Sequence, residues 1–502
     1  MLSTAILRVW HKLPVADATW QGAMVVVLGL LLGACAVAVT ALPTQVAPLL
    51  LIAVLAPFLA MMVRDLRRLF LTALVFDIPF RIDINLGFRE DAAKFGSIEG
   101  FNFSVSTFAL VGLYGLWLGQ AILNDSTRPR LRLSEARPLG MYVAVVALSL
   151  LVARDPMLSL FQLNFLVQEF LLFLYIVSTI RSKDEVLFLF TLLVVGLVLE
   201  GGLIVAVRFT GFSLAVSGLS TAVDAGYVTG GAARLGGTLG APNNAAAYFV
   251  VVLPIAMSLL LIHTERWRYV LASLGLGLGG MALVITQSRG GWGAFAIAAL
   301  IFCLVAWRSG KLSPAIPCVI GVVGILLLVL FQDTIAARFS ADDNGAAYSR
   351  VPLMQLAFRM IEDNPVLGVG ANNFAFCIPE YLTPELASAW RYTVHNKYLL
   401  LWAEIGTVGL GIFLWFFWSA LRRGWQSWKL QDDLLAPLSL GITAALLGHA
   451  SHMFAEAFNG RPMTNLLVLC TALLTVMSII SKHEKATAHH DSPQHGWRVD
   501  HA

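Results

Sequence analysis

A histidine with two polar neighbours stands directly before an apolar run in TVHNKYLLLWAEIG, residues 393–406. His395 is a candidate general base, because imidazole exchanges protons near neutral pH. We expect Asn396 to cap the helix that follows or to orient the ring. Glu404 follows nine residues after His395 and would lie roughly on the opposite face of that helix, so the two should not pair directly. We expect Glu404 to bond a neighbouring helix instead.

Three arginines could bind an anion, because planar, permanently charged guanidinium groups suit phosphate oxygens. They are Arg234 in RLGGTLGAPNNAAAY, Arg289 in TQSRGGWGAF and Arg350 in YSRVPLMQLAFRMIEDNPVLGVGANNF. Gly290 and Gly291 would let another group approach the backbone beside Arg289. The alternatives are a snorkelling Arg289 at the membrane interface and a plain loop after Arg234, in which Asn243 or Asn244 caps the next helix.

The segment that begins at Arg350 has an amphipathic pattern. Met354, Ala357, Phe358 and Ile361 recur at helical spacing. We therefore expect a helix whose apolar face lies on the membrane surface. For Arg350 itself, the alternative to anion binding is an ordinary solvated charge.

A further polar cluster occurs in GHASHMFAEAFNGRP. His449, His452 and Glu456 are spaced i, i+3 and i+7, which would place them on one face of a helix. That spacing can hold a metal ion. Because no fourth ligand is evident, a polar stripe packed against other helices is the favoured interpretation, with His452 and Glu456 as supporting residues. We predict no metal site and no cofactor.

A membrane-spanning scaffold must position these side chains. Of the 502 residues, 58% are hydrophobic and only 13% are charged, against about 25% charged in soluble domains. Long uncharged runs, such as residues 22–41 and 437–450, recur along the chain. The sequence predicts an all-α polytopic membrane protein with about 12–14 transmembrane helices.

The polar interruptions form two sets. Short basic segments, among them residues 64–68, 181–185 and 308–311, should face the cytoplasm together with both termini. Longer mixed segments should form the outer face, and the largest, residues 332–395, ends at the candidate base. No basic patch alternates with aromatic residues, so we expect no nucleic-acid partner.

The chain divides into three regions on this interpretation. Residues 1–210 form an N-terminal transmembrane region with an outer loop near residues 77–103, whose apolar residues alternate as in a β-strand. Residues 211–481 form a transmembrane core that includes the large loop 332–395. Residues 482–502 form a His-rich cytoplasmic tail that we expect to be disordered.

The segments around Arg234, Arg289, Arg350 and His395 occur in this order, and together they closely resemble the O-antigen ligase and O-antigen polymerase superfamily of bacterial inner-membrane glycosyltransferases. The resemblance covers roughly residues 234–462. It implies a multi-span fold in the bacterial inner membrane, with a large periplasmic loop between late helices. It also implies that Arg289 and Arg350, with Arg234 as a further candidate, bind a diphosphate and that His395 is the base.

The same resemblance implies an undecaprenyl-diphosphate-linked glycan as donor and a lipid or glycan as acceptor. The reaction would proceed at the periplasmic face without a metal ion and would invert the anomeric centre. A ligase of lipopolysaccharide or exopolysaccharide biosynthesis and a repeat-unit polymerase need the same site, so this alternative stays open. A flippase or exporter is disfavoured, because the outer charges concentrate in the C-terminal half and the two halves look unlike.

Overall fold

The computed structural model describes residues 65–80, 83–123, 131–211, 232–312, 350–386, 391–429 and 432–490, with scattered residues within 215–229 and 321–332. This part of the chain forms fourteen α-helices, of which eight are long and apolar enough to cross a membrane. The protein is therefore an all-α polytopic membrane protein. The spans expected in residues 1–64, and most of the one expected in residues 313–332, lie outside the described residues.

The described elements follow one another in the order α4 (Leu66–Phe80), β1 (Asp83–Leu86), α5 (Glu90–Lys94), β2 (Phe101–Ser104), α6 (Val105–Leu123), α7 (Leu133–Ser149), α8 (Pro156–Thr179), α9 (Lys183–Thr210), β3 (Ala215–Val216), β4 (Leu219–Ser220), β5 (Val228–Thr229), β6 (Ala232–Ala233), η2 (Gly237–Leu239), α10 (Pro242–Leu259), α11 (Arg266–Ile285), α12 (Arg289–Arg308), α15 (Arg350–Asp363), α16 (Phe374–Tyr381), η3 (Pro384–Leu386), α17 (Lys397–Lys429), α18 (Leu435–His452) and α19 (Arg461–His490).

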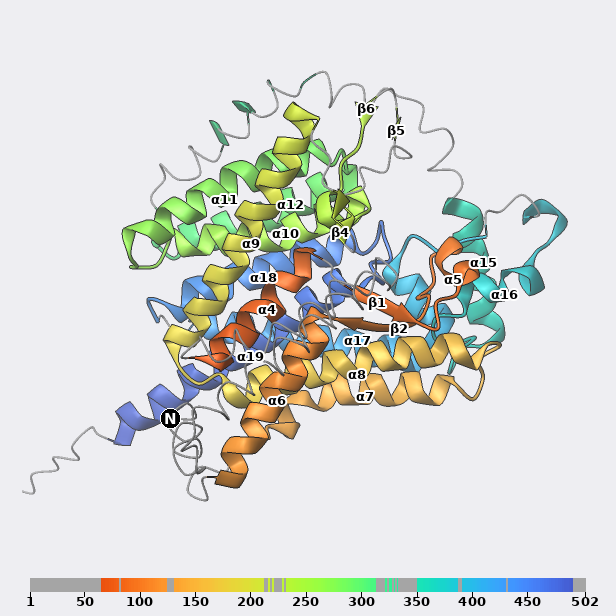
Figure 1. Cartoon of the computed structure of the whole chain (residues 1–502), viewed down its shortest axis with the longest axis horizontal. Helices are drawn as coiled ribbons and strands as arrows, with labels where there is room; N and C mark the ends of the chain where they lie inside the picture. The colour runs from red at the N-terminus through yellow and green to blue at the C-terminus, as the bar shows by residue number, and fades with distance from the viewer. Residues whose placement is uncertain are drawn as a thin grey trace, which may run out of the picture.

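Helices α10, α18 and α19 form the centre of the bundle. Nearly every residue of α10 is buried, and α18 packs against both α10 and α12. Helix α19 packs against α8 and α17. Figure 1 shows α10, α11 and α12 on one side of α18, and α7 and α8 on the far side of α17 and α19. Consecutive spans thus enclose a core in which polar groups need partners within the protein.

Local sequence sets where several helices begin and end. Asp155 caps α8 by accepting a hydrogen bond from the backbone N of Met157. Ser182 and Glu185 form a capping box at the start of α9, and Gly211 in the left-handed conformation ends it. These caps satisfy backbone groups that a hydrocarbon environment could not.

The basic segments gather at one end of the bundle. Their ion pairs join Arg67 to Glu185, Lys183 to Asp432, Lys311 to Asp433 and Arg423 to Glu135. These pairs connect several of the short segments that were expected to share the cytoplasmic face. The grouping therefore agrees with the charge pattern of the sequence.

Residues 83–104, which we call the outer segment, form a small unit at the opposite end. Strands β1 and β2 pair antiparallel, with Asp83 opposite Ser104 and Leu86 opposite Phe101, and α5 lies in the connection between them. The side chains of β2 alternate between half-buried and buried. The strand-like alternation predicted for this part of the chain is confirmed.

Helix α15 differs from the expected membrane-surface helix. Its buried face consists of Leu353, Leu356, Ala357, Met360 and Ile361, and the helix packs against α16 and α17. The expectation that this apolar face lies on the membrane is therefore wrong for most of it, because protein side chains cover it.

The last helix also differs from expectation. Helix α19 continues to His490, past residue 481, where the disordered tail was expected to begin. Lys183 pairs with both Asp432 and Glu484, so the extension beyond the span is tied to the basic end of the bundle. Residues 491–502 of the expected tail lie outside the described part of the chain.

Candidate active site

His395 lies just before α17, in contact with a carboxylate from a distant part of the chain. Its Nδ1 atom is 2.8 Å from Oε1 of Glu456. The two side chains are only 19% and 16% exposed. Asn396 caps the helix, because its Oδ1 accepts hydrogen bonds from the backbone N atoms of Tyr398 and Leu399 at 3.0 and 3.1 Å. The capping alternative for Asn396 is confirmed.

Glu456 does not share a helix face with the two histidines that precede it. Helix α18 ends at His452, and the chain turns through residues 453–455 before it reaches Glu456. The prediction of one helical stripe is therefore wrong for Glu456. A poorly exposed carboxylate needs partners, and the turn brings Glu456 to partners on two other elements.

A chain of hydrogen bonds links Glu456 to the first of the three arginines. Asn243 donates through Nδ2 to Oε2 of Glu456 at 3.0 Å, and Oδ1 of Asn243 accepts from Nη2 of Arg234 at 2.9 Å. Nε of Arg234 donates to the backbone O of Thr286 at 3.1 Å. The structure thus brings His395, Glu456 and Arg234 into one polar network.

The expected capping role of the asparagines in this segment is wrong. Ala241 occupies the N-cap position of α10 and Pro242 opens the helix, so neither Asn243 nor Asn244 caps it. Asn243 instead bridges a carboxylate and a guanidinium group, as its amide can donate and accept at once. No sequence pattern singles out this bridge, although Asn243 does stand at the end of an apolar run.

Arg289 is the first residue of α12 and is half-buried. Ser288 caps this helix by accepting a hydrogen bond from the backbone N of Gly291. A Cβ atom at Gly290 would lie 3.1 Å from Nε2 of His452, so the absence of a side chain there lets α12 pack closely against the end of α18. Arg289 therefore begins a helix whose first turn contacts the segment that leads to Glu456.

Arg350 is the first residue of α15 and is also half-buried. Leu353, one turn further along, belongs to the same hydrophobic cluster as Val394 and Ala457. Those two residues are the chain neighbours of His395 and Glu456. Arg350 thus lies on the same end of the bundle as the His395–Glu456 pair, although it is not part of the hydrogen-bonded chain described above.

The electrostatics of Glu456 favour its charged form. Burial by itself raises the pKa of this carboxyl, but the hydrogen bond and the charge attraction of His395, with the hydrogen bonds from Asn243 and the backbone of Ala457, lower the pKa to about 2. In the neutral imidazole, an Nδ1–H group that donates a hydrogen bond to this carboxylate leaves Nε2 with the free lone pair. Nε2 is therefore the ring atom that can accept a proton from another molecule.

His449 and His452 make contacts that differ from the expected polar stripe. Nδ1 of each ring has no hydrogen-bond partner among the described residues, and both rings pack against Phe458, with centroid distances of 5.1 and 4.7 Å. Within the described part of the chain, no group of three or more His, Cys, Asp or Glu side chains is arranged to hold a metal ion.

Glu404 bonds a neighbouring element, as predicted. Its Oε1 accepts a hydrogen bond from the backbone N of Phe374 at 3.2 Å, at the start of α16. Lys397, on the same helix as Glu404, donates to Oδ1 of Asn459 at 2.6 Å. These two charged side chains tie α17 to α16 and to the loop that follows Glu456.

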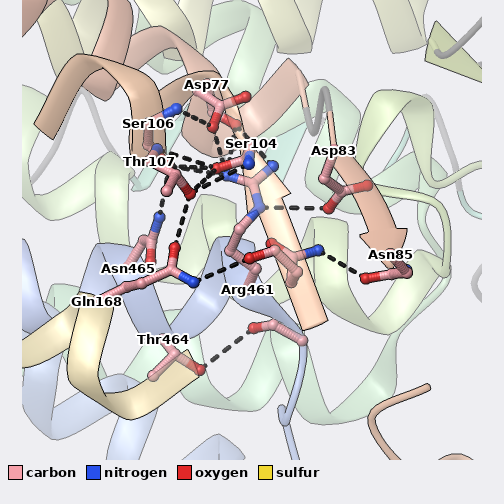
Figure 2. Close-up of polar contacts among 12 residues, drawn as sticks. Asp77, Asp83, Asn85, Ser104, Ser106, Thr107, Gln168, Arg461, Thr464 and Asn465 are labelled. Carbon is pink, nitrogen blue, oxygen red and sulfur yellow. Dashed lines mark hydrogen bonds and ion pairs between the residues drawn. The ribbon is translucent and has the colours of Figure 1, made fainter. Parts of the chain in front are cut away.

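An arginine that sequence reasoning did not single out anchors that loop from its other side. Arg461 at the start of α19 is buried, and its Nη1 lies 2.6 Å from Oδ2 of Asp77 while its Nε lies 3.3 Å from Oδ2 of Asp83. Figure 2 shows the guanidinium between the two carboxylates, with Ser106 donating its backbone N–H to Asp77. A charge at the end of an apolar run was the available signal.

The family described as O-antigen ligase matches residues 274–414. This range contains Arg289, Arg350 and His395 but not Arg234, Asn243 or Glu456. A search of curated proteins finds no match to this chain.

Proposed function

We propose that this chain, of which residues 274–414 match the family described as O-antigen ligase, is an inner-membrane glycosyltransferase of the ligase type. It transfers a glycan from an undecaprenyl-diphosphate-linked donor to an acceptor hydroxyl at the periplasmic face. The observation that carries the proposal is the pairing of Nδ1 of His395 with Oε1 of Glu456 at 2.8 Å. That pairing leaves one imidazole nitrogen available as a base.

The proposed reaction begins when Nε2 of His395 takes the proton from the acceptor hydroxyl. The acceptor oxygen forms a bond to the anomeric carbon as the bond from that carbon to the diphosphate oxygen breaks. The electron pair leaves with the undecaprenyl diphosphate, so the configuration at the anomeric carbon is inverted. Glu456 stabilises the imidazolium that forms, because its negatively charged carboxylate accepts a hydrogen bond from Nδ1 throughout.

The arginines bind the diphosphate and stabilise the negative charge that grows on it as the bond breaks. Arg289 and Arg350 lie at the starts of α12 and α15, where helix dipoles also favour an anion. Arg234 has a second role, since it supports Asn243 and through it Glu456. We propose that these guanidinium groups, rather than a metal ion, neutralise the leaving group.

The proposal is tested with purified protein, an undecaprenyl-diphosphate oligosaccharide and a lipid A–core acceptor. His395→Ala should reduce kcat on the order of 10²–10⁴-fold, whereas His263→Ala, at an exposed position of the basic end, should not. Arg289→Ala should raise KM for the donor, and Arg308→Ala at the other end of the same helix serves as its control. Transfer by the His395→Ala variant at the wild-type rate would refute the proposed role of His395 as the general base.

A repeat-unit polymerase would use the same residues on a different acceptor. The assay therefore also supplies a lipid-linked repeat unit as acceptor. Transfer to the lipid A core supports the ligase, and chain extension without transfer to the core supports the polymerase. A chain that moves the lipid-linked glycan across vesicles without forming a glycosidic bond would be a flippase, and the proposal would then be wrong.

A further inference from the structure

The outer segment, residues 83–104, contacts the chain directly before His395. The backbone N of Thr393 donates to the backbone O of Phe95 at 3.1 Å, and the Thr393 hydroxyl lies 3.5 Å from the backbone O of Gly96. The guanidinium of Arg391 lies over the ring of Phe95, 4.2 Å from its centroid. Two consecutive residues of the outer segment, Phe95 and Gly96, thus contact the residues that directly precede the candidate base.

The same stretch is held from a second side by the start of α16. Nε of Arg391 donates to the backbone O of Ala375 at 2.9 Å. The outer segment is itself fixed to this region, because the side chain of Asn372 accepts from the backbone N of Ile98 at 2.7 Å and donates to its O at 2.9 Å. Residues 391–393 therefore lie between two elements that are bonded to each other.

Tyr392 transmits this placement to the imidazole. Its ring stacks on the ring of His395, with centroids 5.5 Å apart and planes inclined by 21°. At Gly96, which has a φ of +75°, a Cβ atom would lie 2.5 Å from Cζ of Tyr392. The phenol ring therefore occupies the space that a side chain at position 96 would fill, and the outer segment sets where the ring can lie.

Stacking adds a constraint that the carboxylate does not provide. The hydrogen bond from Nδ1 of His395 to Glu456 restrains the imidazole at one edge of the ring. Contact with a second ring over the face restrains its tilt as well, because offset stacking favours nearly parallel planes. The direction in which Nε2 points therefore depends on Tyr392 as well as on Glu456.

We propose that the outer segment positions His395 for proton transfer through Tyr392, which makes Tyr392 a positioning residue of the transfer reaction. The inference rests on the proposed role of His395 as base. It assigns a function to residues 83–104, which lie outside the range that matches the O-antigen ligase family. It also explains why position 96 is a glycine that meets Tyr392.

Substitutions at Tyr392 test the inference with the full-length purified protein in the transfer assay described above. Tyr392→Ala and Tyr392→Leu should lower kcat on the order of 10–100-fold while KM for the donor changes by less than about twofold. Tyr392→Phe retains the flat ring and should keep most of the wild-type kcat. Leucine fills much of the space of the side chain without a flat ring. The leucine variant therefore tests the stacking argument if the alanine variant does not fold.

Two variants of the outer segment complete the test. Gly96→Ala should lower kcat as Tyr392→Leu does, because it displaces the ring. Phe88→Ala changes an aromatic residue of the same segment that is 58% exposed and should leave kcat unchanged. A Tyr392→Leu variant with wild-type kcat, or a Tyr392→Phe variant as impaired as leucine, would overturn the inference. If His395→Ala itself is fully active, the proposed function fails, irrespective of Tyr392.

Discussion

Oε1 of Glu456 and Nδ1 of His395 lie 2.8 Å apart, although 61 positions of sequence separate the two residues. One residue precedes α17 and the other follows α18, so the pairing depends on how these two helices end. The carboxylate is held in turn by Asn243 from α10. Three elements therefore converge on one imidazole, and the pair should behave as a unit in kinetics.

Removal of the carboxylate charge should slow transfer without weakening donor binding. Glu456→Gln is expected to lower kcat on the order of 10–100-fold, because the amide cannot stabilise an imidazolium as a carboxylate does. The double variant His395→Ala/Glu456→Gln should be no slower than His395→Ala alone. Steady-state kinetics on the four proteins measure the coupling, and fully additive losses would show that the two residues act independently.

The low pKa of Glu456 predicts a pH dependence of stability. A carboxyl whose pKa falls from 4.5 to about 2 on folding stabilises the fold above pH 4.5, and the stabilisation is lost as the pH drops toward 2. The difference in unfolding free energy between wild type and Glu456→Gln should thus be on the order of 3 kcal/mol at neutral pH and shrink in acid. Thermal unfolding in detergent from pH 6 to about pH 2 measures it.

A control variant belongs to the same series. Glu362→Gln alters an exposed carboxyl on α15 and should follow the wild-type curve at every pH. A stability difference between wild type and Glu456→Gln that stays constant down to the lowest pH would contradict the charge argument. The protonated carboxyl would then differ from the amide as much as the ionised carboxylate does.

The buried pair of Arg461 and Asp77 should matter more for stability than an exposed pair. Asp77→Asn leaves a buried guanidinium with weaker compensation and is expected to cost about 3–5 kcal/mol of unfolding free energy. Lys311→Ala breaks a pair whose carboxylate is 90% exposed and should cost less than about 1 kcal/mol. Denaturant unfolding of both variants measures the two losses of unfolding free energy. Equal losses would show that the Arg461–Asp77 pair stabilises the fold no more than an exposed ion pair does.

Two glycines of α17 should respond in opposite ways to alanine. Gly406 has φ 68° and ψ −174°, and a Cβ atom there would lie 2.1 Å from the backbone O of Val366. Gly406→Ala should therefore cost more than about 2 kcal/mol or prevent folding. A Cβ at Gly411 would meet open space, so Gly411→Ala should be neutral or stabilise by up to about 1 kcal/mol. Thermal unfolding midpoints of the two variants in detergent decide the comparison.

Much of the scaffold follows directly from hydropathy and charge. Long apolar runs such as those of α9 and α19 predicted membrane helices. In the hydrocarbon of a bilayer every backbone polar group needs a hydrogen-bond partner within the protein, and a helix provides these partners. The basic segments that were expected to share a face do meet, as Lys183 with Asp432 shows. The same reasoning predicted that His395 and Arg234 would lie at a common end, and the hydrogen-bonded chain between them agrees.

The contacts within the site could not be predicted in this way. Periodicity continued the α18 helix through Glu456, whereas the helix ends at His452, and only this early end turns the carboxylate toward His395. The stacking of Tyr392 on His395 depends on Gly96, almost three hundred positions away. Such pairings arise from tertiary packing and leave no periodic signal in the sequence.

The hydrogen bond between Thr393 and Phe95 also determines when the proposed site can be completed during synthesis of the protein. The outer segment is synthesised early, but its partner is synthesised only after most of the candidate membrane spans of the described residues. The proposed site can therefore be assembled only late in biogenesis. For the same reason, a chimera that carries residues 274–414 of another member of the matched family should need a compatible outer segment if the proposed function is to be retained.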